Sequence, residues 1–284
     1  MHTDVTDLRD FYQTPLGLVA RRLLAQKIRA KWPRAANALA ASTVAANTAN
    51  GTARYGTGSP TASRDINGPV VVGPVVMGFG FASPFLGSFR GEASRICALM
   101  PSGQGALVWP TADRNMSVLV DEEHLPLPDN SVDRMLIVHG LEVAERPTAL
   151  LREMWRVLTP TGRLLIVAPN RTGIWARTDR TPFGQGRPYS RGQLDRLLRE
   201  AMFTPLNWDS ALHLPPIQRA LIVRSASTIE RIGATISPRF AGVILAEATK
   251  ELIAPIGLRA PAKALRNLVP LPTVLVPQGV RRKT

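Results

Sequence analysis

The fold is decided by residues 132–170, "VDRMLIVHGLEVAERPTALLREMWRVLTPTGRLLIVAPN". Two apolar runs, at 132–140 and 163–170, have the length and composition of buried parallel strands. Between them apolar residues recur at helical spacing, and Pro160 and Gly162 end the pattern. The apolar residues of this helical pattern are Leu150, Leu151, Met154, Trp155 and Leu158. The stretch therefore predicts a strand, helix, strand unit.

Strands and helices alternate on both sides of this unit. Apolar runs at 70–79, 95–100 and 116–121 precede it; a helix at 189–203, a strand at 204–214, a helix at 218–233 and a last strand at 241–255 follow it. The alternation predicts an α/β fold with a doubly wound, mostly parallel sheet of about seven strands. An amphipathic N-terminal helix is predicted to include Leu18 and Ile28 and to stop at Pro33.

Four segments are predicted along the chain. Residues 35–68 consist mainly of Ala, Thr, Asn, Gly and Ser, so they carry little apolar surface to bury and are predicted to be a flexible, low-complexity insertion. Residues 1–34 are predicted to be an N-terminal helical segment. Residues 69–254 are predicted to form the α/β domain, and residues 255–284 a basic tail that contains prolines.

The composition indicates a globular protein of a reducing compartment. The 284 residues are 45% hydrophobic, which is enough for one large core. One cysteine, Cys97, excludes an internal disulfide, and the four histidines form no ligand motif, so we expect no metal. The first residues have no apolar signal region and no window is apolar enough for a membrane span, so we expect a cytoplasmic protein.

The net charge of +14 lies mostly in the C-terminal half of the chain. Nucleic-acid platforms interleave cations with exposed aromatic side chains, whereas aromatic residues here are 6% and stand mainly in apolar contexts. We therefore expect no specific nucleic-acid partner; the oligomeric state stays open. The arginines of 171–191 follow a strand end, where they either bind an acidic substrate or face solvent.

Residues 121–170 resemble the core of class I S-adenosylmethionine-dependent methyltransferases of the small-molecule type called methyltransferase type 11. The resemblance is carried by "DEEHLPLPD" (121–129), "HGLE" (139–142), "RVLTPTG" (156–162) and the final "PN" (169–170), in that order. In outline it covers roughly residues 70–250. It implies a Rossmann-like fold, S-adenosylmethionine as cofactor, and in-line transfer of a methyl group to a small-molecule substrate. Such a transfer works by positioning, so it needs no catalytic triad.

The resemblance also implies the site residues. In a doubly wound sheet, ligands bind outside the carboxyl ends of the strands where the strand order reverses. Contacts with the cofactor are implied for Gly78, Phe79, Gly80, Phe81, Ala82, Asp121, Glu122 and His139. Among these, Asp121 and Glu122 stand at the position that meets the adenine. His139 is in addition the candidate catalytic residue, as a base or as a group that orients the substrate.

The glycine loop departs from the pattern of the family. An acid usually stands where Gly78 is, and Ala82 and Pro84 replace two of three glycines, so the first glycine motif is degenerate. The second strand lacks the acid that holds the ribose, since Met100 and Pro101 stand there. Binding is thus expected to be weak. If the site is merely degenerate, an acid introduced at Gly78 is expected to tighten binding.

Each candidate residue has a purely structural alternative. The glycines can form only a tight turn, His139 can be a packed core histidine, and Asp121 with Glu122 can be a solvated loop. Two other functions therefore stay open: a catalytically silent methyltransferase fold with a binding or regulatory role, and a nicotinamide-dependent enzyme. The second lacks the glycine fingerprint followed by an acid about 20 residues on.

We predict that residues 35–68 are dispensable for folding. Burial within such a segment cannot offset the entropy of ordering it. Replacing it by a short linker between Arg34 and Pro69 should change the melting temperature by no more than a few degrees, measured by circular dichroism. A large drop in the melting temperature would show that the segment packs on the rest of the chain.

Overall fold

The computed structural model describes residues 4–33, 73–217, 225–226, 230–231, 233 and 240–251. The predicted insertion (35–68), the predicted tail (255–284) and most of the helix predicted at 218–233 lie outside these residues.

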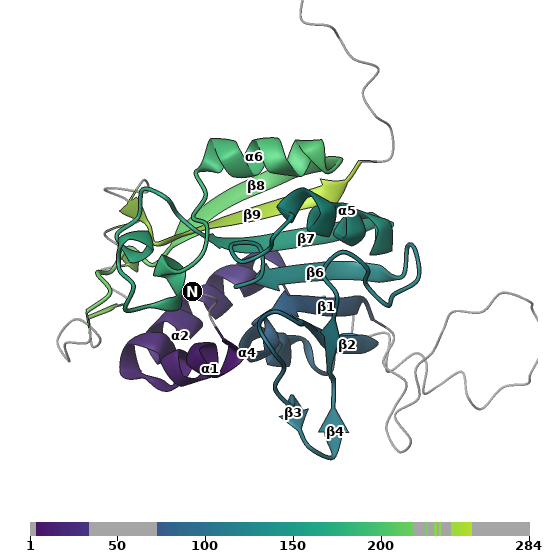
Figure 1. Cartoon of the computed structure of the whole chain (residues 1–284), viewed down its shortest axis with the longest axis horizontal. Helices are drawn as coiled ribbons and strands as arrows, with labels where there is room; N and C mark the ends of the chain where they lie inside the picture. Colours follow the sequence, from purple (N-terminus) through teal and green to yellow (C-terminus); the bar gives the residue numbers. More distant parts are fainter. Residues whose placement is uncertain are drawn as a thin grey trace, which may run out of the picture. The chain divides into compact units, whose positions relative to one another are not determined.

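The core of the fold is a seven-stranded sheet, and the predicted α/β architecture is confirmed (Figure 1). The strands, in their order across the sheet, are β5 (Ser117–Val120), β2 (Arg95–Pro101), β1 (Val75–Gly80), β6 (Val132–Val138), β7 (Leu158–Pro169), β9 (Val243–Lys250) and β8 (Phe203–Ala211). The first five run parallel to one another, and β9 runs antiparallel to both β7 and β8. A separate pair, β3 (Pro110–Thr111) and β4 (Arg114–Asn115), was not predicted.

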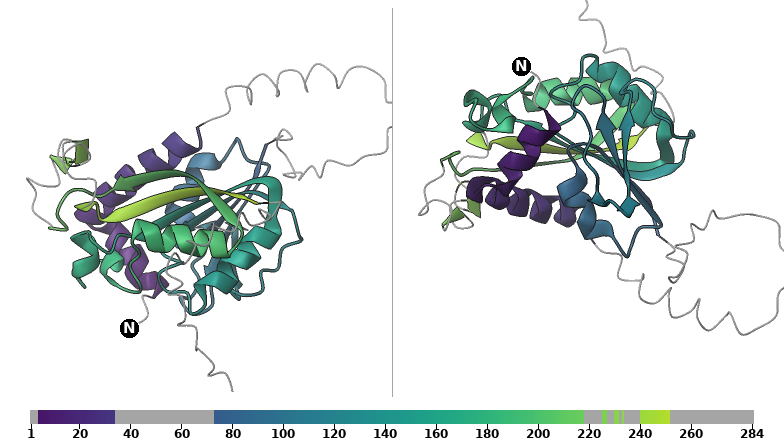
Figure 2. Two further views of the ribbon diagram at one scale, coloured as in Figure 1. Left: turned by 90° about the horizontal axis from the view of Figure 1, so that it is seen from above. Right: turned by 60° about the horizontal axis from the view of Figure 1, so that its bottom comes forward.

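Helices cover both faces of the sheet. They are α1 (Val5–Gln13), α2 (Pro15–Lys31), α4 (Ser83–Leu86), α5 (Pro147–Val157) and α6 (Arg191–Glu200), with single turns η1 (Gly87–Phe89), η2 (Trp175–Arg177) and η3 (Pro182–Gly184). In Figure 2, α2 and α6 lie on opposite sides of the strands. Among the described helices, none is long and apolar enough to cross a membrane.

The N-terminal segment contains two helices where the sequence predicted one. Asp4 caps α1, because its side chain accepts a hydrogen bond from the Thr6 amide. Thr14 ends α1 and caps α2 through a 3.0 Å bond from the Gly17 amide, and Pro15 then fits the first position of α2. The prediction missed α1, although its buried residues Val5, Leu8, Phe11 and Tyr12 recur at helical spacing.

Side chains of each strand alternate between two buried cores. In β6, Leu136 and Val138 pack with α1, α2 and α4, whereas Met135 and Ile137 pack with α5 and α6. All four are fully buried. A strand covered on both faces is apolar where it is covered, which explains the continuous apolar run at 135–138.

The order of strands reverses between β1 and β6. The chain runs outward from β1 to β2 and β5 on one side, then returns to β6 and β7 on the other. Beyond the carboxyl ends of β1 and β6 lies the crevice where ligands bind in this class of sheet. The amide of Phe81 crosses it and donates a 2.7 Å hydrogen bond to the carbonyl of Val138.

Two glycines make the end of β1 close-packed. Gly80 has φ +74°, and a Cβ there would collide with the Val138 carbonyl oxygen and lie 2.9 Å from the Cα of Gly140. A Cβ at Gly78 would lie 2.6 Å from the Cβ of Ala82 and 2.8 Å from Leu86 Cδ1. The expectation that an acid at Gly78 tightens cofactor binding stays a prediction, but an aspartate there would first have to displace Ala82 and Leu86.

We predict that Gly80→Ala destabilises the protein more than Gly91→Ala, and Gly91→Ala more than Gly87→Ala. Gly91 also has positive φ (+86°) but open space around its Cα, so alanine there meets only the backbone penalty of about 1–2 kcal/mol. Gly87 has neither constraint. Urea denaturation gives the three free energies of unfolding. If Gly80→Ala and Gly91→Ala lower the free energy of unfolding equally, the ends of β1 and β6 can move apart without an energetic cost.

Candidate functional site

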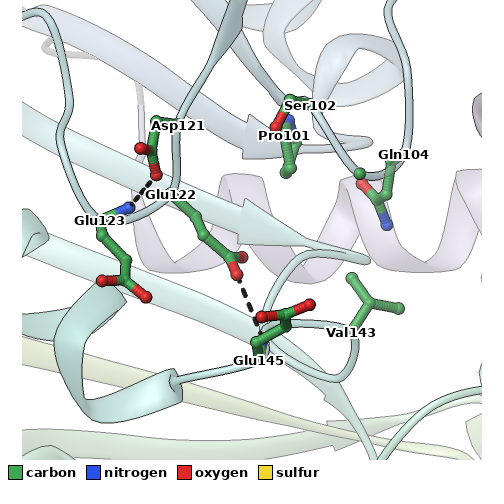
Figure 3. Close-up of a pocket in the computed structure, with 9 residues that line it drawn as sticks. Pro101, Ser102, Gln104, Asp121, Glu122, Glu123, Val143 and Glu145 are labelled. Carbon is green, nitrogen blue, oxygen red and sulfur yellow. Dashed lines mark hydrogen bonds between the residues drawn. The ribbon is translucent and has the colours of Figure 1, made fainter.

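A cavity of about 280 Å³ opens at the carboxyl ends of β2, β5 and β6 (Figure 3). Four carboxylates line it: Asp121, Glu122, Glu123 and Glu145. The other lining residues are Pro101, Ser102, Gly103, Gln104 and Val143, so the lining contains no lysine, arginine or histidine. We call this cavity the acidic pocket. It favours ligands that donate hydrogen bonds or carry positive charge.

Asp121 and Glu122 point in different directions. Asp121 Oδ1 accepts a 2.9 Å bond from the Glu123 amide in its own loop, and this bond is the largest cause of a lowered pKa for the exposed Asp121 carboxyl. Glu122 reaches across the pocket, where its Oε1 accepts a 3.1 Å bond from the amide of Glu145 (Figure 3). Burial raises the pKa of Glu122, and the nearby carboxylates raise it further. Glu122 is thus the carboxylate held at the centre of the pocket.

His139 follows β6 and is held from three sides. Its Nε2 lies 2.9 Å from the Tyr12 hydroxyl, and its Nδ1 lies 3.0 Å from Glu142 Oε1. The side-chain amide of Gln104 donates to the His139 carbonyl. His139 has φ +51°, an unusual conformation for a residue with a side chain, which functional sites often contain.

The proton positions of this group follow from Tyr12. Burial, and then the negative charge of Glu142, raise the pKa of Tyr12 well above its ordinary value, so Tyr12 keeps its proton and donates to His139 Nε2. His139 Nδ1 is then the donor to Glu142. The other carboxylate oxygen, Glu142 Oε2, is buried and has no hydrogen-bond partner among the described residues. An unpartnered buried oxygen favours a donor or cationic group nearby.

Aromatic side chains fill the space beside the glycine loop. The ring of Tyr12 stacks on Phe81 at 5.6 Å between centroids, and Phe183 lies 4.6 Å from the imidazole of His139. Tyr12 is 4% exposed, Phe81 3% and His139 2%. The loop after β1 therefore adjoins packed side chains.

The structure separates the predicted site residues into two groups. Asp121 and Glu122 line the acidic pocket. The remaining ones, Gly78, Phe79, Gly80, Phe81, Ala82 and His139, are buried and do not line it. Sequence reasoning did not single out Tyr12, Gln104, Glu142 and Glu145. Glu142 and Glu145 follow β6 within the stretch that carries the resemblance, so their position after a strand end could have indicated them. Tyr12 lies in α1, far away in the sequence, and no sequence pattern connects it with this site.

Residues 78–166 match the family model described as a methyltransferase domain. Those residues run from the end of β1 to β7, so they include the crevice and the acidic pocket. Over these residues the chain is similar to class I S-adenosylmethionine-dependent methyltransferases. S-adenosylmethionine is the cofactor of this family.

Curated relatives match a short part of this domain. The ubiquinone/menaquinone biosynthesis C-methyltransferase of Azotobacter vinelandii is 48% identical over 50 residues, which are 18% of this chain and 20% of that enzyme. The enzyme of the same name from Paraburkholderia phymatum is 43% identical over 51 residues, 18% of this chain and 21% of that enzyme. The chain thus spans about a fifth of the length of the curated relatives it matches.

Solved structures are similar at low identity. An S-adenosylmethionine-dependent methyltransferase from Archaeoglobus fulgidus is 16% identical with a TM-score of 0.47, over 63% of this chain and 86% of that one. The [4+2]-cyclase SpnF is 23% identical with a TM-score of 0.44, over 63% of this chain and 75% of that one. The strand order and the antiparallel β9 are consistent with a Rossmann-like methyltransferase fold.

The two ends of the crevice fit the cofactor differently. The acidic pocket offers carboxylate acceptors for the adenine amino group and the ribose hydroxyls, so it suits the adenosine end. Beside the glycine loop, where the resemblance places the rest of the cofactor, Tyr12, Phe81 and His139 are packed together. The methionine end therefore does not fit in this arrangement of the side chains.

We predict that stability falls as the pH rises above about 10, and that Tyr12→Phe reduces this fall. The unfolded state releases the tyrosine proton near its ordinary pKa of about 10, whereas folded Tyr12 retains it, so the free energy of unfolding decreases with pH by up to about 1.4 kcal/mol per unit. Urea denaturation at a series of alkaline pH values measures this slope.

Tyr189→Phe is the matched control for this experiment. Burial raises the pKa of Tyr189 to about 12, so its contribution is lost between about pH 10 and 12. Tyr12→Phe should likewise flatten the slope above about pH 10, because burial raises the pKa of Tyr12 well above its ordinary value. An alkaline slope that Tyr12→Phe leaves unchanged would show that the Tyr12 hydroxyl titrates as if it were exposed.

Proposed function

We propose that the protein is an S-adenosylmethionine-dependent methyltransferase that acts on a small molecule and holds the adenosine end of the cofactor in the acidic pocket. The observation that carries this proposal is the placement of four carboxylates at the carboxyl ends of β2, β5 and β6, inside the segment that matches the methyltransferase domain. The cofactor supplies an activated methyl group, and the chain holds the cofactor and the substrate in the positions that the transfer requires.

The charge of the pocket supports this cofactor over a nicotinamide dinucleotide. S-adenosylmethionine carries a sulfonium and presents amino and hydroxyl donors, all of which carboxylates attract. A dinucleotide would bring a pyrophosphate close to Asp121, Glu122, Glu123 and Glu145, with no basic side chain in the lining to offset the repulsion. The nicotinamide alternative is therefore not proposed.

Individual residues have distinct roles in this proposal. Glu122 accepts hydrogen bonds from the ribose or adenine, with Asp121 beside it, and the backbone of 78–82 borders the cofactor. His139 orients the substrate or accepts its proton at Nε2, and Glu142 holds the ring through Nδ1. In this structure Tyr12 occupies Nε2. The proposed reaction therefore requires the Tyr12 hydroxyl to leave His139.

A catalytically silent methyltransferase fold is the second candidate. It is favoured by the packing of Tyr12 against Phe81 and His139, which fills the space beside the glycine loop. Such a protein would bind a nucleoside in the acidic pocket and carry out no transfer. The two candidates differ in whether the methionine end of the cofactor contributes to binding.

Calorimetry with S-adenosylhomocysteine and adenosine tests both candidates. A methyltransferase should bind S-adenosylhomocysteine at least about tenfold more tightly than adenosine, because the methionine end adds charged hydrogen bonds. Equal affinities would favour the silent fold. If neither compound binds at millimolar concentration, both candidates are wrong.

We predict that Glu122→Gln weakens S-adenosylhomocysteine binding by about tenfold, since a carboxylate hydrogen bond becomes an amide one. The matched control is Asp113→Asn, which also removes one negative charge but lies exposed in the turn between β3 and β4. The control should bind as the unchanged protein does. A similar loss in both variants would mean that only the overall charge matters.

A further inference from the structure

A second cavity, of about 490 Å³, lies between α5 and α6. Three arginines line it: Arg171 follows β7, Arg187 precedes α6, and Arg196 is in α6. Glu200 is the one acidic residue in its lining. We call this cavity the arginine pocket. Its charge is opposite to that of the acidic pocket.

Within the described part of the chain, no carboxylate forms an ion pair with the three arginines. None of the ion pairs between described residues includes Arg171, Arg187 or Arg196. By contrast Arg199, in the same helix as Arg196, holds Asp195 at 3.0 Å. Like charges gathered in one cavity repel one another, so an anion that enters the cavity relieves this repulsion.

Backbone hydrogen bonds hold two of the arginines in place. The Arg171 amide donates to the Tyr189 carbonyl at 2.9 Å, and the Tyr189 amide donates to the carbonyl of Pro169 at 2.9 Å. The Arg187 amide donates to the carbonyl of Glu142 at 2.7 Å. The backbone of Arg171 and Arg187 is thus fixed at the carboxyl ends of β7 and β6, where ligands bind in such sheets, and both side chains are exposed.

Tyr189 adds a neutral polar group to the arginine pocket. Its hydroxyl donates to the Leu141 carbonyl at 3.2 Å, and burial raises its pKa to about 12. It therefore brings no negative charge at neutral pH. Arg196 is held by α6, whose start is fixed by a capping box between Ser190 and Gln193.

The start of α5 adds to the positive potential. Pro147 and Thr148, its first two residues, line the arginine pocket, and the N-cap residue Arg146 makes no side-chain capping bond. An uncapped helix start carries a partial positive charge and amide donors. This contribution is secondary to that of the three guanidinium groups.

We propose that the arginine pocket binds an oxyanion, the phosphate or carboxylate group of a small metabolite. Guanidinium groups match both groups because their planar donors form paired hydrogen bonds with two oxygens. The segment 142–148 separates this pocket from the acidic one, since Val143 and Glu145 line one and Pro147 and Thr148 the other. The inference holds whether or not the chain transfers methyl groups.

Titration calorimetry with pyrophosphate and with citrate, on the full chain at constant ionic strength, tests the proposal. We expect saturable binding at one site for at least one of the two. A preference for pyrophosphate identifies a phosphate site, and a preference for citrate a carboxylate site. Absence of saturable binding for both would overturn the proposal.

Variants connect the binding to the pocket. Arg187→Gln with Arg196→Gln should weaken binding at least about tenfold. Glu200→Gln should strengthen it about twofold, because it removes the opposing carboxylate. Arg199→Gln is the control, with the same charge change in the same helix but outside the pocket. If Arg199→Gln weakens binding as much as the double variant, or Glu200→Gln has no effect, binding is to general surface charge and the proposal is wrong.

Discussion

The close approach of β1 to β6 at their carboxyl ends is the constraint on which the rest of the structure depends. Gly80, with positive φ, brings the backbone against Val138 and Gly140, and the amide of Phe81 bonds across the gap. A side chain at Gly80 would push the strands apart at the point where the strand order reverses. The glycine that the family pattern assigns to cofactor contact here has a packing role as well.

This close approach determines the surroundings of His139. Once Phe81 is fixed beside Val138, its ring stacks on Tyr12, and Tyr12 reaches His139. Helix α1 thus becomes part of the crevice although it is more than a hundred residues away in the sequence. The glycine loop is closed by this contact, whereas the acidic pocket between β2 and β5 stays accessible.

The two pockets divide the ligand edge by charge. Four carboxylates gather around the ends of β2, β5 and β6, and three arginines gather beyond the end of β7. Residues 142–148 lie between the two pockets. Within this segment, the carbonyl of Glu142 accepts a hydrogen bond from the amide of Arg187. Two pockets of opposite charge suit two ligands, or two groups of one ligand, that carry opposite charges.

The sequence by itself determined the α/β fold, the mostly parallel sheet and the position of the strand, helix, strand unit at 132–170. Those features depend on local apolar periodicity, which strands buried on both faces display directly. It also placed Asp121 and Glu122 at a strand end. Only the tertiary structure decided that Tyr12 lies on His139, that an acid at Gly78 would have to displace Ala82 and Leu86, and that Arg171, Arg187 and Arg196 share one cavity. These are contacts between residues far apart in the chain, and no periodicity records them, because they depend on how the sheet brings its strand ends together.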